Sequence, residues 1–428
     1  MHATLLSSEP AAKATLTTSP TRIRLVFSEE VEPSLGRIRL VAPDGHVMTL
    51  KSAGDPHDVS ALVAPITLPL EPGAYRVEWR IVSEDGHPID GSYPFTVAPG
   101  AVNGQAATSP PSGANGQPAG AAPSAATAIA TPESQHGAES ETEGDGAGTT
   151  LAEVPKVPAL LRAFAIGTLT AFAGLLGFLV TRRTTTPQPR AARLAHRLAI
   201  ATAIFVPLHL LAWALAVSPD HSLGGDTIAA LLASGPGKVE LGRTVLALLA
   251  TWALLLVRRE RLAFYLAIVA ILAGSAVGHS AGIHPEWGIP GRALHLLAVA
   301  AWLGGLLWLV TLDRTDAPTA IAEAQRVSSL ALIAVIVVTL SGVVQTRLFL
   351  PVWGDLVHSQ YGLIVLAKLA GVGVLVLFGA YHRYRVLPRL TDAAVAEQFP
   401  VSLRREIAVM SLLVLLGGLL AYLSPPTH

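Results

Sequence analysis

Short runs of alternating hydrophobic and polar residues recur through the first part of the chain. They occupy residues 22–27, 37–41, 75–82 and 92–97, with turn signals such as Pro43-Asp44-Gly45 and Glu71-Pro72-Gly73 between them. Alternation with a period of two is typical of a strand that buries one face. The pattern therefore predicts an all-β, immunoglobulin-like sandwich over residues 1–97.

Long apolar segments follow one another from residue 158 onward. They cover residues 160–180, 194–217, 241–257, 262–278, 292–312, 327–349, 360–380 and 406–423. A helix of about 20 apolar residues crosses the hydrocarbon core of a bilayer. The pattern predicts an all-α polytopic membrane domain over residues 158–428, a bundle with eight transmembrane helices.

The segment between these regions, residues 98–157, is rich in Ala, Gly, Pro, Ser and Thr. Such a composition cannot build a core, so we expect a flexible linker with a root-mean-square span of roughly 40 Å. A linker of this length lets the β domain reach any part of the membrane domain on its own side.

The composition narrows the possible functions. Hydrophobic residues make up 51% of the chain and charged residues only 14%, which argues against a purely soluble protein. The formal net charge is zero, so we expect no nucleic-acid partner. The absence of cysteine excludes disulfides and thiolate metal sites, and three methionines are too few for a soft-metal pathway. Histidine, which occurs fourteen times, is the abundant metal-ligating residue besides the carboxylates.

Basic residues gather in alternate connections between the apolar segments. The basic connections are 181–193, 258–261, 313–326 and 381–405, whereas 218–240, 279–291, 349–359 and 424–428 carry only Lys238. The positive-inside rule predicts that the basic connections are cytoplasmic. Both termini and the β domain then lie on the periplasmic or extracellular side of the cytoplasmic (inner) membrane. Because the sequence opens Met1-His2-Ala3 without an apolar export segment, we expect either a mature form or a truncated start, with Met1 foreign to the functional protein.

Three motifs connect the β domain to a known family. They are His2-Ala3-Thr4-Leu5-Leu6-Ser7-Ser8-Glu9-Pro10, Phe27-Ser28-Glu29-Glu30-Val31-Glu32-Pro33 and Ser83-Glu84-Asp85-Gly86-His87-Pro88-Ile89-Asp90-Gly91. The domain resembles the periplasmic copper-binding protein CopC. This resemblance implies that His2, Asp85 and His87 hold Cu(II), with Glu29 near the site. The amino group of His2 can take part only when Met1 is absent.

The chemistry of these side chains agrees with that ligand set. Imidazole and carboxylate donors suit Cu(II). In an extended segment Asp85 and His87 project from the same face and can chelate one ion. Because the region around Asp44-Gly45-His46-Val47-Met48 keeps a single methionine, we expect the domain to bind Cu(II) and not Cu(I).

The membrane region resembles CopD, the inner-membrane partner of CopC. The resemblance is carried by Gly278-His279-Ser280-Ala281-Gly282, His284-Pro285, His295 with Ala301-Trp302-Leu303-Gly304-Gly305-Leu306, Ser341-Gly342 with Gln345, and Ser359-Gln360-Tyr361-Gly362 with Lys368. The transport candidates are His279, His284, His295, His209, Lys368 and Gln345. Ionisable groups at membrane depth are functional candidates, although Lys368 can also extend its amine to the outer interface.

Fused CopC–CopD proteins are associated with copper uptake, so the resemblance implies copper import and homeostasis by a transporter and not an enzyme. Its partners are the copper ion, the lipid bilayer and periplasmic or cytoplasmic copper chaperones. The sequence indicates no oligomeric state. The alternatives are a haem-containing membrane cupric reductase or electron carrier, copper sequestration for resistance without transport, and a copper oxygenase that begins with His2. Because no P-loop is present, a gradient or cytoplasmic chelation would drive transport.

Overall fold

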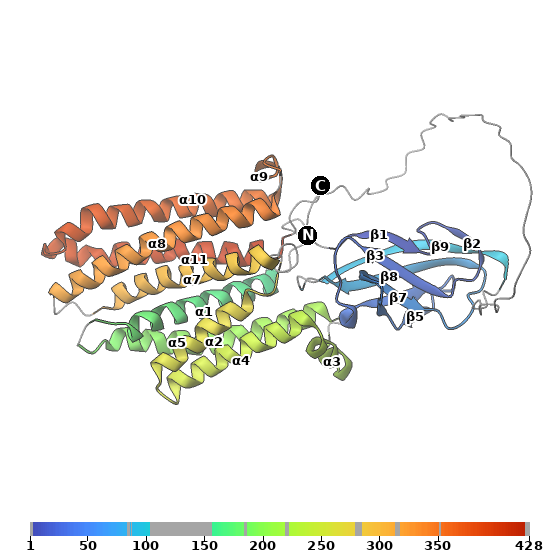
Figure 1. Ribbon diagram of the computed structural model, residues 1–428, viewed down its shortest axis with the longest axis horizontal. Coiled ribbons are helices and arrows are strands. Elements are labelled where there is room, and N and C mark those ends of the chain that lie inside the picture. The colour runs from blue at the N-terminus through green and yellow to red at the C-terminus, as the bar shows by residue number, and fades with distance from the viewer. Residues whose placement is uncertain are drawn as a thin grey trace, which may run out of the picture.

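The computed structural model describes residues 3–83, 86, 88–102, 156–183, 186–218, 222–278, 285–312, 317–350 and 352–423. Most of the expected linker lies outside these residues. So do the predicted ligands His2, Asp85, His87, His279 and His284. A β domain lies at one end of a helical bundle (Figure 1).

The β domain is a sandwich of two sheets. The first has the strand order β1 (Leu5–Glu9), β3 (Arg22–Phe27), β7 (Asp58–Pro65) and β6 (Ala53–Asp55). The second has the order β2 (Thr15–Thr18), β9 (Pro88–Val102), β8 (Gly73–Val82), β4 (Arg37–Val41) and β5 (Val47–Leu50). A short 3-10 helix, η1 (Pro33–Leu35), precedes β4. The expected all-β sandwich is therefore present.

The core of the sandwich follows from the alternation in the sequence. In β3 the side chains of Ile23, Leu25 and Phe27 are buried between more exposed neighbours, as period-two burial requires. Across the core, Phe27 packs edge-on against Trp79 of β8, with 5.1 Å between the ring centroids. Complete burial of each such side chain stabilises the domain by about 1.5–3 kcal/mol.

The membrane region consists of α-helices joined by short connections. They are α1 (Lys156–Val180), α2 (Pro189–Val217), α3 (Gly225–Ala233), α4 (Gly235–Leu255), α5 (Glu260–Gly274), α7 (Pro285–Thr311), α8 (Ala317–Phe349), α9 (Asp355–His358), α10 (Gln360–Tyr381) and α11 (Ala393–Leu420). A π-helical turn, η2 (His382–Val386), and a 3-10 turn, η3 (Leu387–Arg389), follow α10. Side-chain caps begin three of these helices, because the side chains of Ser234, Ser359 and Asp392 accept the N–H groups that lack helical partners.

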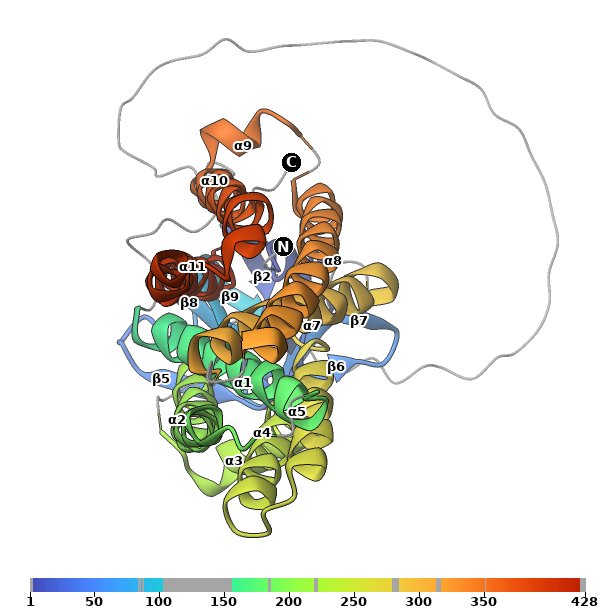
Figure 2. The same cartoon turned by 90° about the vertical axis from the view of Figure 1, so that its left-hand side faces the viewer.

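Helix α1 is the centre of the bundle. It lies between α2, α4 and α5 on one side and α7, α8, α10 and α11 on the other (Figures 1 and 2). The backbones of α1 and α7 approach closely at Gly174 and Gly304, where a side chain on Gly174 would overlap the carbonyl group of Ala300. Small residues permit this approach, which is common where membrane helices pack.

Each of the eight predicted apolar segments forms a helix, but five described helices are long and apolar enough to cross a membrane. These five candidate spans are Lys156–Val180, Pro189–Val217, Pro285–Thr311, Pro318–Phe349 and Gln360–Arg389. The shortfall has physical causes. Helix α4 contains Lys238, Glu240 and Arg243, and α5 has only 15 residues. The remaining three crossings stay a prediction.

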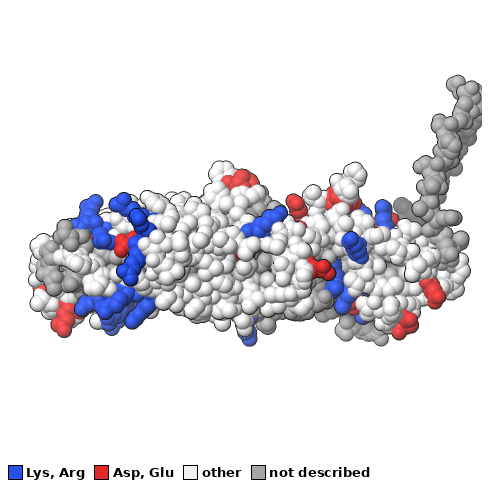
Figure 3. Space-filling view, turned by 90° about the horizontal axis from the view of Figure 1, so that it is seen from below, with Lys and Arg blue, Asp and Glu red and all other residues white. Residues whose placement is uncertain are grey.

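The charges follow the predicted asymmetry of the loops. Lys and Arg gather at the end of the bundle away from the β domain, and a broad uncharged band separates that end from the β domain (Figure 3). Such a band matches the surface that a bilayer would cover.

Candidate functional site

The hairpin formed by β8 and β9 ends at a turn that contains Ser83 and Gly86 of the predicted copper motif. The two strands pair in register from Gly73 and Val97 to Val82 and Pro88. Within this turn the Gly86 N–H donates to the Ser83 carbonyl at 2.8 Å. Gly86 has φ +84°, a left-handed conformation that glycine adopts without strain. Ser83 and Gly86 thus lie at one end of the sandwich.

Glu29, the acidic residue expected near the copper site, lies in the segment beside this turn. The segment follows β3. Val31, two residues after Glu29, forms a β-bridge with Ser83 and so holds the segment in place. The Glu32 N–H also donates to the Val82 carbonyl at 2.8 Å. Glu29 is half-buried there. The fold therefore brings two of the predicted motifs, which are distant in sequence, to the same end of the domain.

The same end of the β domain contacts the helical bundle. The Trp213 indole Nε1 of α2 donates to the Gly86 carbonyl at 2.9 Å. A Cβ on Gly86 would lie 3.5 Å from both Pro236 and Val277, so Gly86 meets three segments of the bundle. The residue between the two predicted ligands Asp85 and His87 is thus packed against the membrane domain.

Further contacts surround this hydrogen bond. Arg80 of β8 donates to the Ala216 carbonyl at 2.6 Å, and the Gly235 N–H donates to the Glu32 carboxylate at 3.1 Å. The second contact places a negative charge at the N-terminus of α4, where the helix dipole favours it. An apolar cluster joins the two domains as well; its buried members are Leu35, Val82, Trp213, Ala214 and Val217.

A buried polar group lies below this interface, inside the bundle. His209 precedes Trp213 by one helical turn and is 1% exposed. Its Nε2 atom is 3.9 Å from Oε2 of Glu240 on α4, which is 2% exposed. Arg243, one turn further along α4, pairs with the same oxygen at 2.5 Å. The tertiary structure therefore brings the predicted candidate His209 next to an acid–base pair.

Two more arginines border this group. Arg162 of α1 is 4% exposed and lies over the Tyr422 ring, 5.6 Å from its centroid. Arg292 of α7 donates to the Val277 carbonyl. The two guanidinium groups meet at Gly278, where a Cβ would lie 2.8 Å from Arg292 and 3.1 Å from Arg162. Three arginines, Arg162, Arg243 and Arg292, thus act electrostatically on His209.

Two other candidates, His295 and Gln345, form a second group between α7 and α8. The His295 ring nitrogen Nδ1 lies 2.9 Å from the Ser341 hydroxyl, and the Gln345 amide donates to the Ser341 carbonyl at 3.3 Å. Lys368 of α10 points toward α11, because a Cβ on Gly417 would lie 3.6 Å from its Nζ atom. The sequence motifs at His295, Ser341 and Gln345 therefore do meet in space.

In the part of the chain that the structure describes, sequence reasoning missed five buried charged side chains: Arg162, Glu240, Arg243, Glu323 and Glu406. At the basic end of the bundle Glu406 lies 3.1 Å from Nδ1 of His382 and accepts from the Trp302 indole at 3.2 Å. Nε2 of His382 lies 2.7 Å from the Ser402 hydroxyl, so both ring nitrogens have partners. The usable signal was the position of each carboxylate at the edge of an apolar segment. Among the described residues, no three His, Asp or Glu side chains converge as a metal site.

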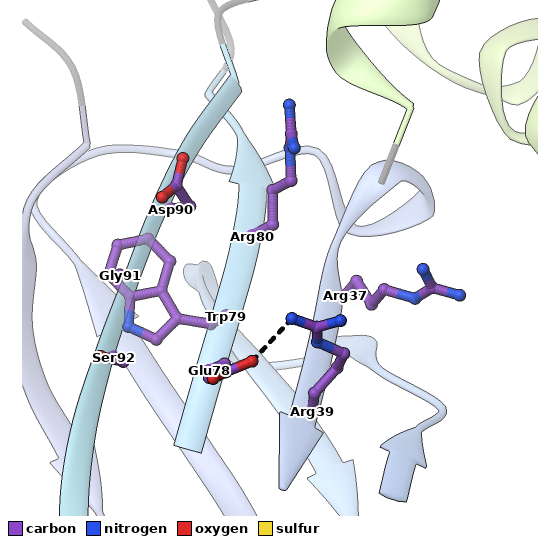
Figure 4. Close-up of a pocket in the computed structure, with 8 residues that line it drawn as sticks. All are labelled: Arg37, Arg39, Glu78, Trp79, Arg80, Asp90, Gly91 and Ser92. Carbon is purple, nitrogen blue, oxygen red and sulfur yellow. Dashed lines mark hydrogen bonds and ion pairs between the residues drawn. The ribbon is translucent and has the colours of Figure 1, made fainter. Parts of the chain in front are cut away.

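A separate groove crosses the outer face of the second sheet (Figure 4). It is lined by Arg37, Arg39, Glu78, Trp79, Arg80, Asp90, Gly91 and Ser92. Arg39 pairs with Glu78 at 2.7 Å, and Gly91 leaves room for the Trp79 ring. None of the predicted copper ligands is among its lining residues.

Fold and site together define a β-sandwich joined to a multi-pass helical membrane protein. A CopC domain model matches residues 5–98, and a model described as copper resistance protein D matches residues 321–420. Through its N-terminal domain the chain belongs to the CopC family, and part of its membrane region matches the CopD model.

Individual proteins are also similar to parts of this chain. Protein YobA of Escherichia coli K12 is 38% identical over 97 residues, which cover 22% of this chain and 78% of YobA. Copper transport protein CutJ of Bacillus subtilis is 26% identical over 419 residues, covering 89% of this chain and 67% of CutJ. The crystal structure of CopC from Methylosinus trichosporium OB3b is 31% identical and covers 23% of this chain and 95% of that chain, with a TM-score of 0.22.

Proposed function

We propose that this protein captures copper outside the cytoplasmic membrane and imports it. The β domain holds Cu(II) through His2, Asp85 and His87, with Glu29 nearby, and delivers it to the membrane domain. Two comparisons support copper as the cargo, namely the match to copper resistance protein D and the similarity to the copper transport protein CutJ.

The contact between Gly86 and Trp213 is the observation that carries this proposal. Gly86 is flanked in sequence by the two predicted ligands, and its carbonyl is bound by a side chain of the membrane domain. Val277, which also approaches Gly86, precedes the predicted outer histidines His279 and His284 by only a few residues. A metal held by the turn therefore starts its transfer beside the bundle.

The orientation of the proposal rests on the charges. The arginine-rich end of the bundle is the end away from the β domain (Figure 3). Since basic loops remain in the cytoplasm, the β domain lies on the outer side, where it meets copper first.

Removal of the predicted ligands tests the function directly. The double variant Asp85→Asn/His87→Ala should lose the copper of the β domain and reduce uptake into proteoliposomes by at least tenfold. His57→Ala is the matched control, because His57 is exposed and lies between β6 and β7, outside the turn. Equal uptake by the wild type and the double variant would refute the proposal.

The same preparations distinguish the alternatives. Sequestration without transport predicts bound copper and no copper inside the liposomes. A haem-containing reductase predicts a Soret absorption band in the purified protein. Import predicts luminal copper that rises with time and no requirement for such a band.

A further inference from the structure

The environment of His209 points to a second binding position, inside the membrane domain. Its side chain is 1% exposed, and neither ring nitrogen has a hydrogen-bond partner among the described residues. Buried polar atoms are ordinarily paired, since an unpaired one loses its hydration without compensation. The unpaired imidazole of His209 and the neighbouring carboxylate of Glu240 are therefore a candidate pair of metal ligands.

The spacing of the donor atoms suits a metal ion. His209 Nε2 and Glu240 Oε2 are 3.9 Å apart. An ion with bonds of about 2 Å to nitrogen and oxygen fits between two atoms at this separation. Imidazole and carboxylate are also the donor types predicted for the β domain, so an ion would exchange one set of ligands for a similar one.

The pair lies directly below the docked turn. Trp213, which binds the Gly86 carbonyl, is four residues beyond His209, and Pro236, which approaches Gly86, is four residues before Glu240. Four helical residues correspond to about 6 Å along each axis. Helices α2 and α4 thus both lead from the interface to the pair.

Arg243 gives the position an electrostatic control. In the structure its guanidinium pairs with Glu240 at 2.5 Å and is itself buried, at 4% exposure. This arginine neutralises the carboxylate, and Arg162 and Arg292 add positive charge near His209. A metal cation must therefore compete with Arg243 for Glu240.

We propose that His209 and Glu240 form the site that receives copper from the β domain, and that Arg243 occupies Glu240 until the ion arrives. The identity of the ion rests on the proposed function, whereas the ligand pair and its competitor rest on this geometry alone. Removal of Arg243 should strengthen metal binding, and removal of either ligand should abolish it.

The test uses the full chain carrying Asp85→Asn/His87→Ala, so that the copper of the β domain does not mask the second position. The purified protein is titrated with Cu(II) and, in the presence of ascorbate, with Cu(I), against a chelator of known affinity. Elemental analysis gives the number of ions per chain.

His209→Gln and Glu240→Gln should each remove one ion per chain or weaken its binding by at least tenfold. Arg243→Gln should tighten binding by about tenfold. His196→Ala, an exposed histidine on the same helix, is the matched control and should change nothing. In the double variant Glu240→Gln/Arg243→Gln both charges of the pair are removed together, so the protein should fold. It should nevertheless fail to bind the ion. This variant therefore separates loss of a ligand from loss of the fold.

Unchanged binding in His209→Gln and Glu240→Gln would overturn the proposal. So would Arg243→Gln with no gain in affinity, because a purely structural ion pair predicts only lower stability. Uptake measured in parallel separates the two hypotheses. Binding at the pair without uptake would refute import alone, and uptake that needs Asp85 and His87 but not His209 and Glu240 would refute this site alone.

Discussion

Among single residues, Trp213 has the most direct role in connecting the two domains. Its indole ring lies in the apolar interface cluster, and its N–H is the donor to Gly86. Substitution by Phe removes the donor but keeps most of the buried area. The two effects of this side chain can therefore be measured separately.

We expect Trp213→Phe to lower copper uptake several-fold without changing the copper affinity of the β domain. Loss of one hydrogen bond costs about 1 kcal/mol of docking free energy. This is enough to lower the fraction of molecules in which the two domains are docked. Uptake in proteoliposomes and copper titration of the same samples provide the measurement. Trp252→Phe, on the exposed face of α4, is the control. A fall in affinity would contradict the transfer role.

Arg24 of β3 joins two carboxylates of the first sheet, Asp55 on β6 and Asp58 on β7. It binds Asp55 and Asp58 at 2.8 Å each. The guanidinium of Arg24 and the His57 N–H lower the pKa of Asp55, while the Ser60 hydroxyl and Arg24 lower the pKa of Asp58. A carboxyl group whose pKa is lower in the folded state stabilises the fold at pH values above its pKa in the unfolded state. This contribution is lost as the pH falls through the pKa of the folded state.

The expressed β domain, residues 1–102, should therefore lose stability as the pH falls from about 5 through the depressed pKa values. Arg24→Leu should make this part of the pH profile flatter. Urea unfolding followed by circular dichroism at several pH values measures the effect. Arg37→Leu, which leaves both carboxylates paired with Arg24, should retain the wild-type slope.

At the level of secondary-structure elements, the contact between α1 and α7 determines how closely the bundle packs. Gly174→Ala should destabilise the protein by about 1–3 kcal/mol, because the new methyl group would overlap the Ala300 carbonyl. Thermal unfolding in detergent measures the loss. Gly373→Ala in α10 is the control, since no atom lies within 4 Å of the added Cβ and Ala favours helix. Equal effects would show that α1 and α7 are not tightly packed.

For the whole molecule, the orientation in the membrane is the main prediction. The chain contains no cysteine, so a single introduced cysteine is the only thiol in the protein that a maleimide can label. In spheroplasts a membrane-impermeant maleimide should label Lys51→Cys on the β domain and leave Arg259→Cys unlabelled. Permeabilised cells should label both, because both positions are exposed. Labelling of Arg259→Cys alone in intact cells would reverse the proposed direction of transport.

The architecture was predictable because it depends on local patterns. Period-two alternation predicted strands such as β3 and β8, and long apolar segments predicted the helices. Lengths were harder, since α7 begins at Pro285 and not near residue 292. Whether α4 and α11 cross the bilayer depends on charged residues whose burial inside the bundle the linear pattern does not reveal, and α5 is short, with 15 residues.

The sequence by itself determined the two domains, the family and the types of side chain available for copper. Periodicity, composition and short motifs are local properties, so they can be read from the sequence without knowledge of which residues are in contact. Only the tertiary structure decided that Gly86 meets Trp213 and that His209 meets Glu240 and Arg243. These residues are distant in sequence, and their proximity arises from domain docking and helix packing, which depend on surfaces formed only after folding.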